Sequence, residues 1–245
     1  MSDNRNRDPY LYDDIDILKN IPGVKTAEEL KRIEGDLTKV TMGIVYAQDY
    51  AKFNTGTLCQ IHRTIFGSLF DWAGEFRTIH LYKREELLGG DTVRYAQPQD
   101  IKKELAAASK EISKLKLNED PKTLVFKIVR ITASIWHTHP FREGNTRTVV
   151  AFSVLLAAKF GIQMDYALFE KHASYVRNAL VWCTQGIYSK FEYLEQIYYD
   201  AAGLINVEIP SAETKNNKYS SIGKYQVSDY KEQPHIYIDI SEDRT

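Results

Sequence analysis

The stretch HTHPFREGNTR, residues 137–147, places two histidines, a proline, a glutamate and two arginines close together. A largely apolar run, TVVAFSVLLAAKFG, follows it directly. The preceding run PKTLVFKIVRITASIW, residues 121–136, has the spacing of a mainly apolar helix, with a proline well placed as its first residue. Because Pro140 pushes the residue before it out of the helical region, we predict that this helix ends near His137–His139.

A second helix is predicted over residues 145–161, immediately after the polar stretch. Gly144 permits a tight reversal of the chain, and Asn145 or Thr146 is suited to cap the new helix. The helix is apolar on nearly all sides, so we expect it to be buried with only its N-terminal end near the surface. Such an end presents unpaired N–H groups and a partial positive charge, which together bind anions.

Three charged or titratable side chains surround this predicted anion site. Arg147 lies in the first helical turn, where a cation opposes the helix dipole unless an anion accompanies it. Glu143 lies just outside the helix and is suited to hold Mg²⁺, which commonly uses one or two carboxylates together with substrate phosphates. His139 can accept a proton near neutral pH. We interpret the stretch as a phosphate-binding loop with a general base at its edge.

Composition narrows the class of protein. The 245 residues include 32 Lys and Arg against 33 Asp and Glu, which argues against an electrostatic nucleic-acid binder. Cys59 and Cys183 belong to no CxxC pair, as expected for idle thiols in a reducing compartment. The polar N-terminus does not resemble a signal peptide, and the longest apolar run, residues 149–158, is shorter than the about 20 residues that span a bilayer. We therefore expect a cytoplasmic protein that binds neither nucleic acid nor membrane.

The pattern along the chain predicts a mainly α fold. Thr26 and Glu29 have the spacing of a capping box, and an amphipathic stripe of Leu30, Ile33, Leu37 and Val40 follows them. Residues 72–98 alternate and contain a Gly-Gly-Asp turn signal, which predicts a β-hairpin or ribbon. The tail, residues 205–245, is polar and turn-rich, with a strand-like HIYIDI, and is predicted to be a separate, partly β appendage. Helices are predicted within residues 21–48, 54–70, 99–115, 121–136, 145–161, 165–185 and 189–204.

The nine residues HPFREGNTR, 139–147, resemble the catalytic motif HPFx[D/E]GNxR of the Fic family. Two flanking stretches are also similar to family members: DPYLYDD with LKNIPGVKTAEELKRIEGDLT, and FDWAGEFRT before the predicted hairpin. The resemblance covers about residues 9–203. It implies a Fic domain over residues 1–204: a helical bundle with an N-terminal helical segment at about 9–50, a β-hairpin flap at about 80–97 and the catalytic loop at 139–147.

What the resemblance implies is a protein adenylyltransferase, which uses ATP and Mg²⁺ to transfer AMP to a Ser, Thr or Tyr hydroxyl of a target protein or of itself, with release of pyrophosphate. His139 is then the general base, and Glu143 is the Mg²⁺ ligand. Other residues of the motif bind the phosphates or support the loop, and the flap aligns the target through main-chain hydrogen bonds. The phosphate-binding residues are Gly144, Asn145, Thr146 and Arg147, the supporting ones are Pro140 and Phe141, and the flap residues are Tyr82, Lys83 and Tyr95.

The chain departs from the fullest form of the motif, GNGRxxR, at two positions. Thr146 replaces a glycine, and Val150 replaces the second arginine, which in the family contacts the γ-phosphate and pairs with an inhibitory glutamate. The inhibitory pattern [S/T]xxxE[G/N] is approached at Glu34, with Leu30 in place of Ser or Thr, and at Glu232 in the tail. Each is a candidate inhibitory residue, with a solvated helix charge as the alternative for Glu34. An antitoxin partner is a further alternative.

Other functions are compatible with parts of the pattern. His137, His139 and Glu143 could form the metal site of a metallohydrolase, although the remaining histidines, including His62, are scattered singly and are predicted to be ordinary helix-face residues. The substitution at Val150 also suits a catalytically weak Fic domain that acts as a regulatory or toxin–antitoxin partner. Removal of AMP by the same site is another alternative. A kinase-like reaction is disfavoured because the relatives that use it carry a lysine and lack the Gly-Asn pair.

Overall fold

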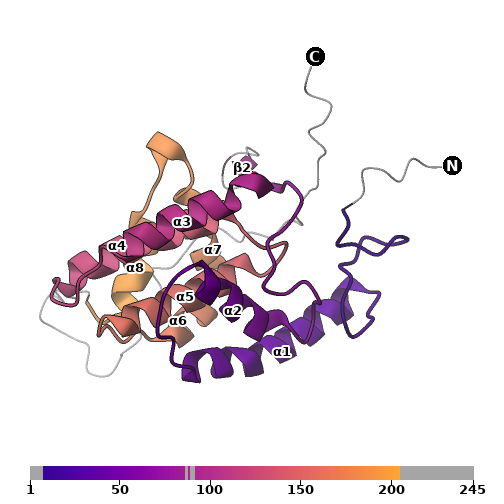
Figure 1. Cartoon of the computed structure of the whole chain (residues 1–245), viewed down its shortest axis with the longest axis horizontal. Coiled ribbons are helices and arrows are strands. Elements are labelled where there is room, and N and C mark those ends of the chain that lie inside the picture. The colour runs from indigo at the N-terminus through magenta and orange to yellow at the C-terminus, as the bar shows by residue number, and fades with distance from the viewer. Residues whose placement is uncertain (1–7, 86–87, 89–91, 205–245) are drawn as a thin grey trace, which may run out of the picture.

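The computed structural model describes residues 8–85, 88 and 92–204, and within them the fold is mainly helical (Figure 1). This agrees with the predicted fold class. The tail, including Glu232 and the HIYIDI stretch, lies outside the described residues, as does the tip of the hairpin. In chain order the elements are α1 (Ala27–Ala47), α2 (Thr55–Phe66), β1 (Tyr82–Arg84), β2 (Thr92–Arg94), η3 (Pro98–Asp100), α3 (Ile101–Ile112), α4 (Pro121–Thr138), α5 (Asn145–Lys159), α6 (Tyr166–Lys171), α7 (Ala173–Trp182), η4 (Gly186–Tyr188) and α8 (Glu192–Ala201).

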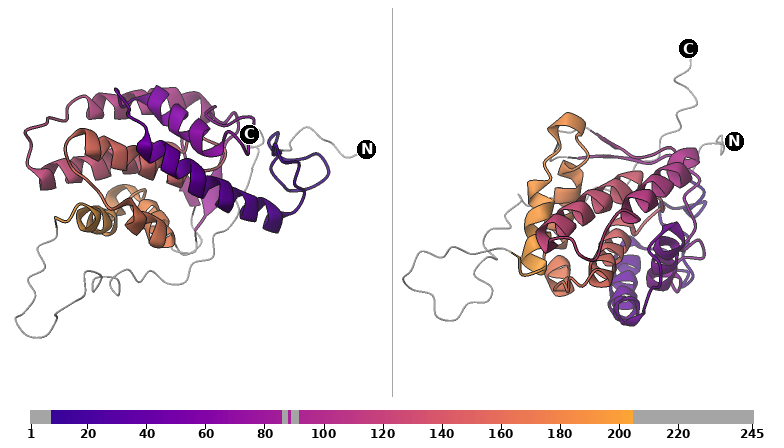
Figure 2. Two further views of the ribbon diagram at one scale, coloured as in Figure 1. Left: turned by 90° about the horizontal axis from the view of Figure 1, so that it is seen from below. Right: turned by 60° about the vertical axis from the view of Figure 1, so that its left-hand side comes forward.

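Helix α5 lies at the centre of the bundle and contacts α1, α2, α4 and α6. Ten of its 15 residues are buried, which confirms the prediction of a helix that is covered on nearly all sides. Helix α4 packs against α5 on one side and against α3 and α8 on the others, and Figure 2 shows these helices stacked beside one another. The N-terminal end of α5 therefore starts inside the domain, at a place that α1, α2 and α4 all reach.

Helix α1 begins as predicted, because the Thr26 side chain accepts a hydrogen bond from the N–H of Glu29 at 3.4 Å. It packs against α2 and α5. The predicted apolar stripe is only partly correct: Leu30 is buried, but Val40 is 67% exposed. The face that α1 turns inward includes Thr38, which is buried next to the start of α5.

Two predicted helices have different limits in the structure. The helix expected over residues 165–185 is divided into α6 and α7, because His172 leaves the helical region at φ −115° and ψ 35°. The helix expected over residues 54–70 ends at Phe66. Neither proline nor glycine marks the break at His172, so the sequence offered no local signal for it.

The predicted ribbon is present, but its strands are short. β1 and β2 pair antiparallel, with Tyr82 opposite Arg94 and Lys83 opposite Val93. Residues 72–81, which we expected to alternate as a strand, are instead turns and irregular chain. Within the described part of the chain, no helix is both long and apolar enough to cross a membrane.

Candidate active site

The histidine of the HPF motif closes α4. The helix ends at Thr138, and His139 adopts the left-handed conformation at φ 49° and ψ 60°, as the one non-glycine residue of the described chain with positive φ. Its N–H donates to the carbonyls of Ile135 and Trp136. The predicted end of the helix is thus confirmed. Left-handed backbone at a non-glycine residue costs about 1–3 kcal/mol and persists where the surroundings enforce it.

The imidazole of His139 is held in one orientation by two rings. It stacks on Tyr95, with centroids 3.8 Å apart and an interplanar angle of 18°, and meets Trp136 edge-on at 5.5 Å. Its Nδ1 lies 3.3 Å from the carbonyl oxygen of Trp136. Because a carbonyl only accepts hydrogen bonds, this contact assigns the proton to Nδ1 and the basic lone pair to Nε2. Tyr95, which the resemblance places on the flap, follows β2 and is buried against the histidine ring.

The loop that joins α4 to α5 is closed by its own asparagine. Gly144, with φ 78°, is the N-cap of α5, and no side chain caps that end, so the prediction that Asn145 or Thr146 would cap it is wrong. The Asn145 side chain accepts from the N–H of Phe141 at 2.9 Å and donates to the carbonyl of Phe141 at 2.8 Å. The Thr146 hydroxyl accepts from the indole N–H of Trp136. Both side chains therefore brace the loop and leave the first-turn amides of α5 without a side-chain cap.

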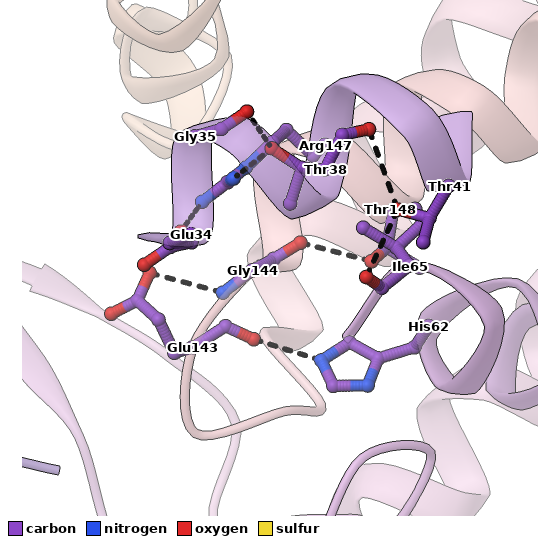
Figure 3. A network of polar contacts seen from close by, with 10 residues as sticks. All are labelled: Glu34, Gly35, Thr38, Thr41, His62, Ile65, Glu143, Gly144, Arg147 and Thr148. Atoms are coloured by element: carbon purple, nitrogen blue, oxygen red, sulfur yellow. Dashed lines mark hydrogen bonds and ion pairs between the residues drawn. The ribbon is translucent and has the colours of Figure 1, made fainter. Parts of the chain in front are cut away.

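Glu143 lies at the positive end of α5, next to these amides. Its carboxylate accepts a hydrogen bond from the N–H of Gly144 at 3.0 Å (Figure 3). An anion at this position is stabilised by the helix dipole. The start of α5 thus already holds one carboxylate in the way in which it would hold a phosphate.

His62 of α2 supports the loop from behind, and the expectation that it is an ordinary helix-face residue is wrong. Its Nδ1 accepts from the N–H of Gly74 at 2.8 Å, so the proton is on Nε2, which donates to the carbonyl of Glu143 at 3.0 Å. The ring also stacks on Phe141, 3.8 Å away. Burial lowers the pKa of His62 to about 4, so the imidazole is neutral at physiological pH.

Arg147 is paired with Glu34 across the boundary between α1 and α5 (Figure 3). Its guanidinium also donates to the hydroxyl of Thr38 at 3.4 Å. The Glu34 side chain is 18% exposed, so the alternative of a solvated helix charge is wrong. Val150, at the second-arginine position, is buried one turn further along α5.

A cavity of about 350 Å³ opens beside Arg147, between α1, α5, α6 and α7. Thr146, Arg147 and Val150 line its α5 side, and Lys39 of α1 adds a second cation. The volume lies within the range of about 300–1,000 Å³ that is typical of small-molecule pockets. The pocket therefore adjoins the N-terminal turn of α5.

Three buried arginines were not singled out from the sequence: Arg77, Arg142 and Arg177. Arg142 pairs with Asp8 at 2.8 Å, which ties the N-terminal segment to the loop. Arg177 of α7 makes a two-point ion pair with Glu85, just after β1. Arg77 donates to main-chain carbonyls, described below. Arg77 belongs to the FDWAGEFRT stretch and Arg142 to the HPF motif, but their partners are too distant in sequence to be predicted.

The metallohydrolase alternative depended on a cluster of ligands. In the part of the chain that the structure describes, no group of three or more His, Cys, Asp or Glu side chains could hold a metal ion. Glu143 lies at the N-terminal end of α5, where its carbonyl accepts from His62 and its carboxylate accepts from the N–H of Gly144.

Comparison with known proteins finds the family that the loop motif resembles. Residues 52–157 match the model of the Fic/DOC family. The chain is 26% identical over 165 residues to the protein adenylyltransferase VbhT of Bartonella schoenbuchensis, covering 67% of this chain and 34% of VbhT. It is 27% identical over 169 residues to the probable protein adenylyltransferase Fic of Escherichia coli, covering 68% of this chain and 80% of that protein.

Solved structures share the fold. BepC from Bartonella tribocorum, determined with bound AMPPNP, superposes with a TM-score of 0.66 at 23% identity and covers 78% of this chain and 95% of that one. The N-terminal Fic domain of a putative cell filamentation protein from Bartonella quintana, with bound ADP, has a TM-score of 0.66 at 22% identity and covers 78% of this chain and 93% of that one. The chain therefore contains a domain of the Fic/DOC family, which includes residues 52–157.

Proposed function

We propose that the chain is a protein adenylyltransferase, which transfers AMP from ATP to a Ser, Thr or Tyr hydroxyl of a target protein. The observation that carries the proposal is the pairing of an oriented imidazole, His139, with a helix N-terminus that has no side-chain cap. The names of the related proteins of Bartonella and Escherichia coli support the same reaction.

The reaction needs a base on one side of the α-phosphorus and charge stabilisation around it. The target hydroxyl oxygen attacks the α-phosphorus and forms the new P–O bond, while the bond from that phosphorus to the α–β bridging oxygen breaks. Pyrophosphate leaves with the electron pair, and Nε2 of His139 takes the hydroxyl proton. The fixed tautomer favours this role, since the Nδ1 proton is held by the Trp136 carbonyl.

The first-turn amides of α5 are suited to hold the α- and β-phosphates, with Arg147 at the distal phosphates. Glu143 fits a Mg²⁺ ligand because its carboxylate lies at this end of the helix, and Mg²⁺ commonly uses one or two carboxylates together with phosphate oxygens and water. Bound there, the ion would neutralise charge on the phosphates. The pocket beside Arg147 offers further room next to the loop.

The hairpin is suited to dock the target chain. β1 carries Tyr82 and Lys83 and pairs with β2 on one side, and a two-stranded sheet presents outer edges to which an extended segment can add. Main-chain pairing of this kind aligns a hydroxyl without reading much of the target sequence.

Glu34 is suited to act as an internal inhibitor. It occupies Arg147, the arginine that would grip the distal phosphates, and Val150 leaves no second arginine on the next turn to share that task. ATP would have to displace the carboxylate from the guanidinium in order to bind fully. We expect the resting enzyme to be weakly active for this reason.

Intact-mass analysis with ATP and Mg²⁺ tests the proposal. The wild type and Glu34→Gln should gain AMP, the variant faster, and His139→Ala should gain none. A matched control, Glu28→Gln, removes an exposed carboxylate from the same helix and should behave as the wild type does. Labelling that survives His139→Ala would exclude His139 as the base.

A catalytically weak domain that serves as a regulatory or antitoxin-binding partner is the second candidate. The buried Val150, together with the occupied Arg147, is the observation that favours it. Under this alternative, neither the wild type nor Glu34→Gln would gain AMP at any protein concentration, although both would bind an ATP analogue. A third outcome, loss of AMP from a premodified target, would indicate the reverse reaction.

A further inference from the structure

Arg77 lies in the interior, 2% exposed, between α2 and β1. Its four guanidinium hydrogen bonds all end on main-chain carbonyl oxygens. Nε donates to His139 at 2.7 Å, Nη1 to Ile79 at 2.5 Å, and Nη2 to Ala96 at 2.5 Å and Thr138 at 3.4 Å. Its own N–H donates to the Pro140 carbonyl at 2.9 Å.

These partners belong to two parts of the site. One part is the backbone around the catalytic histidine, formed by Thr138, His139 and Pro140. The other part is the base of the hairpin, since Ile79 precedes β1 and Ala96 follows β2. The carbonyls of both residues accept from the same guanidinium, and we call these two residues the hairpin feet. One side chain therefore joins the hairpin to the peptide groups on both sides of His139.

An arginine is suited to this task because its planar group presents five donors in a fixed fork, whereas a lysine presents a flexible point charge. Burial lowers the pKa of Arg77 to about 10, so the cation persists at neutral pH. Nearby Tyr10, Tyr95 and Glu104 partly offset that lowering. Carbonyl dipoles, in place of a carboxylate partner, satisfy the buried charge.

The left-handed conformation of His139 makes the hydrogen bonds that Arg77 donates to the carbonyls of Thr138 and His139 important. A left-handed histidine persists only where its neighbours enforce it, and Arg77 binds the carbonyls on either side of its α-carbon. Tyr95, adjacent to Ala96, stacks on the imidazole from the hairpin side. Movement of the hairpin feet would thus move both the backbone and the ring of the histidine.

We propose that Arg77 is a positioning residue that fixes the register between the hairpin and the imidazole of His139. A target chain aligned on the hairpin then presents its hydroxyl at a constant distance from Nε2. This inference rests on the proposed function for its catalytic consequence, but the structural coupling is testable without any activity.

The first test compares wild type with Arg77→Lys, which keeps the charge and loses the fork. In protein with labelled histidine, the NMR signals of the His139 ring should move in Arg77→Lys, because the stacking on Tyr95 is loosened. The control Arg130→Lys alters an ion pair between α4 and α8 and should leave those signals in place. Unchanged His139 signals in a folded Arg77→Lys protein would overturn the proposal.

A second measurement uses the wild type alone, in case Arg77→Lys does not fold. Native-state hydrogen exchange should show the amides of Arg77, of the β1–β2 pairs and of His139 opening with the same free energy, as one unit. Hairpin amides that open separately, at a much lower free energy than His139, would contradict a fixed register.

The kinetic arm depends on the proposed function. If wild type transfers AMP, Arg77→Lys should lower kcat about 100-fold, the order expected for a misplacement of about 1 Å, with KM for ATP unchanged within about twofold. A raised KM with unchanged kcat would show that Arg77 serves nucleotide binding and would overturn the proposal. If wild type transfers nothing, the proposed function fails, while the NMR and exchange arms still decide the role of Arg77.

Discussion

Replacing Glu34 by glutamine should strengthen nucleotide binding, because it releases Arg147. The pair is partly buried, with side chains 18% exposed at Glu34 and 38% at Arg147. Exposed ion pairs contribute about 0.2–1 kcal/mol, and hydrogen bonds to charged groups contribute about 1.5–3 kcal/mol. For a pair between these limits we take about 1–2 kcal/mol.

A phosphate that displaces the carboxylate of Glu34 from Arg147 must break this pair, so binding is weaker by the free energy of the pair. Without the pair, the Kd of an ATP analogue should therefore fall about 5- to 30-fold, at about 1.4 kcal/mol for each factor of ten. Titration calorimetry with AMPPNP and Mg²⁺ measures the change directly. The Glu28→Gln control, on the exposed face of the same helix, separates release of Arg147 from a general loss of negative charge.

A double-mutant cycle gives the strictest form of this test. In an Arg147→Gln background, Glu34→Gln should have little effect, because there is no guanidinium left to release. An equal gain in affinity with and without Arg147 would refute the reasoning. So would an unchanged Kd in Glu34→Gln alone.

Other predictions concern the supports of the site. Burial lowers the pKa of His62 from 6.5 to about 4, so the neutral side chain contributes fully to stability above pH 6.5 and this contribution is lost as the pH falls towards 4. The contribution to the free energy of unfolding is about 3 kcal/mol. Urea titrations should therefore show a shallower pH dependence of that free energy in His62→Asn. Gly144→Ala should lower Tm more than Gly161→Ala: both glycines have positive φ, but a Cβ at Gly144 would overlap the ring of Phe66, whereas nothing lies within 4 Å of a Cβ at Gly161. Equal Tm losses would contradict this close packing. Glu85→Gln and Arg177→Gln should each lower the free energy of unfolding by about 3–5 kcal/mol, as measured with denaturant, because each leaves a buried charge unpaired. The double variant should lose less than the sum of the two single losses, and additive losses would argue against a coupled buried pair.

The features that the sequence predicted well depend on near neighbours along the chain. Pro140 ends α4, Gly144 turns the loop, and the unbroken apolar pattern buries α5. Thr26 caps α1 through a residue three positions away. Such effects act over one or two helical turns, so they can be predicted from a single sequence.

The features that could not be predicted join residues that are distant in sequence. His62 bonds to a carbonyl 81 positions away, and Arg77 to carbonyls 61 and 62 positions away. The pairing of Glu34 with Arg147 spans 113 positions. Helical periodicity states which face of a helix is buried, but it does not state which side chain the partner helix presents there. The prediction for Asn145 is wrong for a different reason, because its partner, Phe141, is near in sequence: its preference for capping gave way to two hydrogen bonds within the loop.

The central claim is that His139 directs the α-phosphoryl group of ATP onto a hydroxyl. Incubation with ATP labelled at either the α- or the γ-phosphate, in wild type and in His139→Ala, tests it most directly. Protein-bound label is expected from α-labelled ATP alone, and none is expected in His139→Ala. Label transferred from the γ-phosphate, or an α-label that persists without His139, would contradict it.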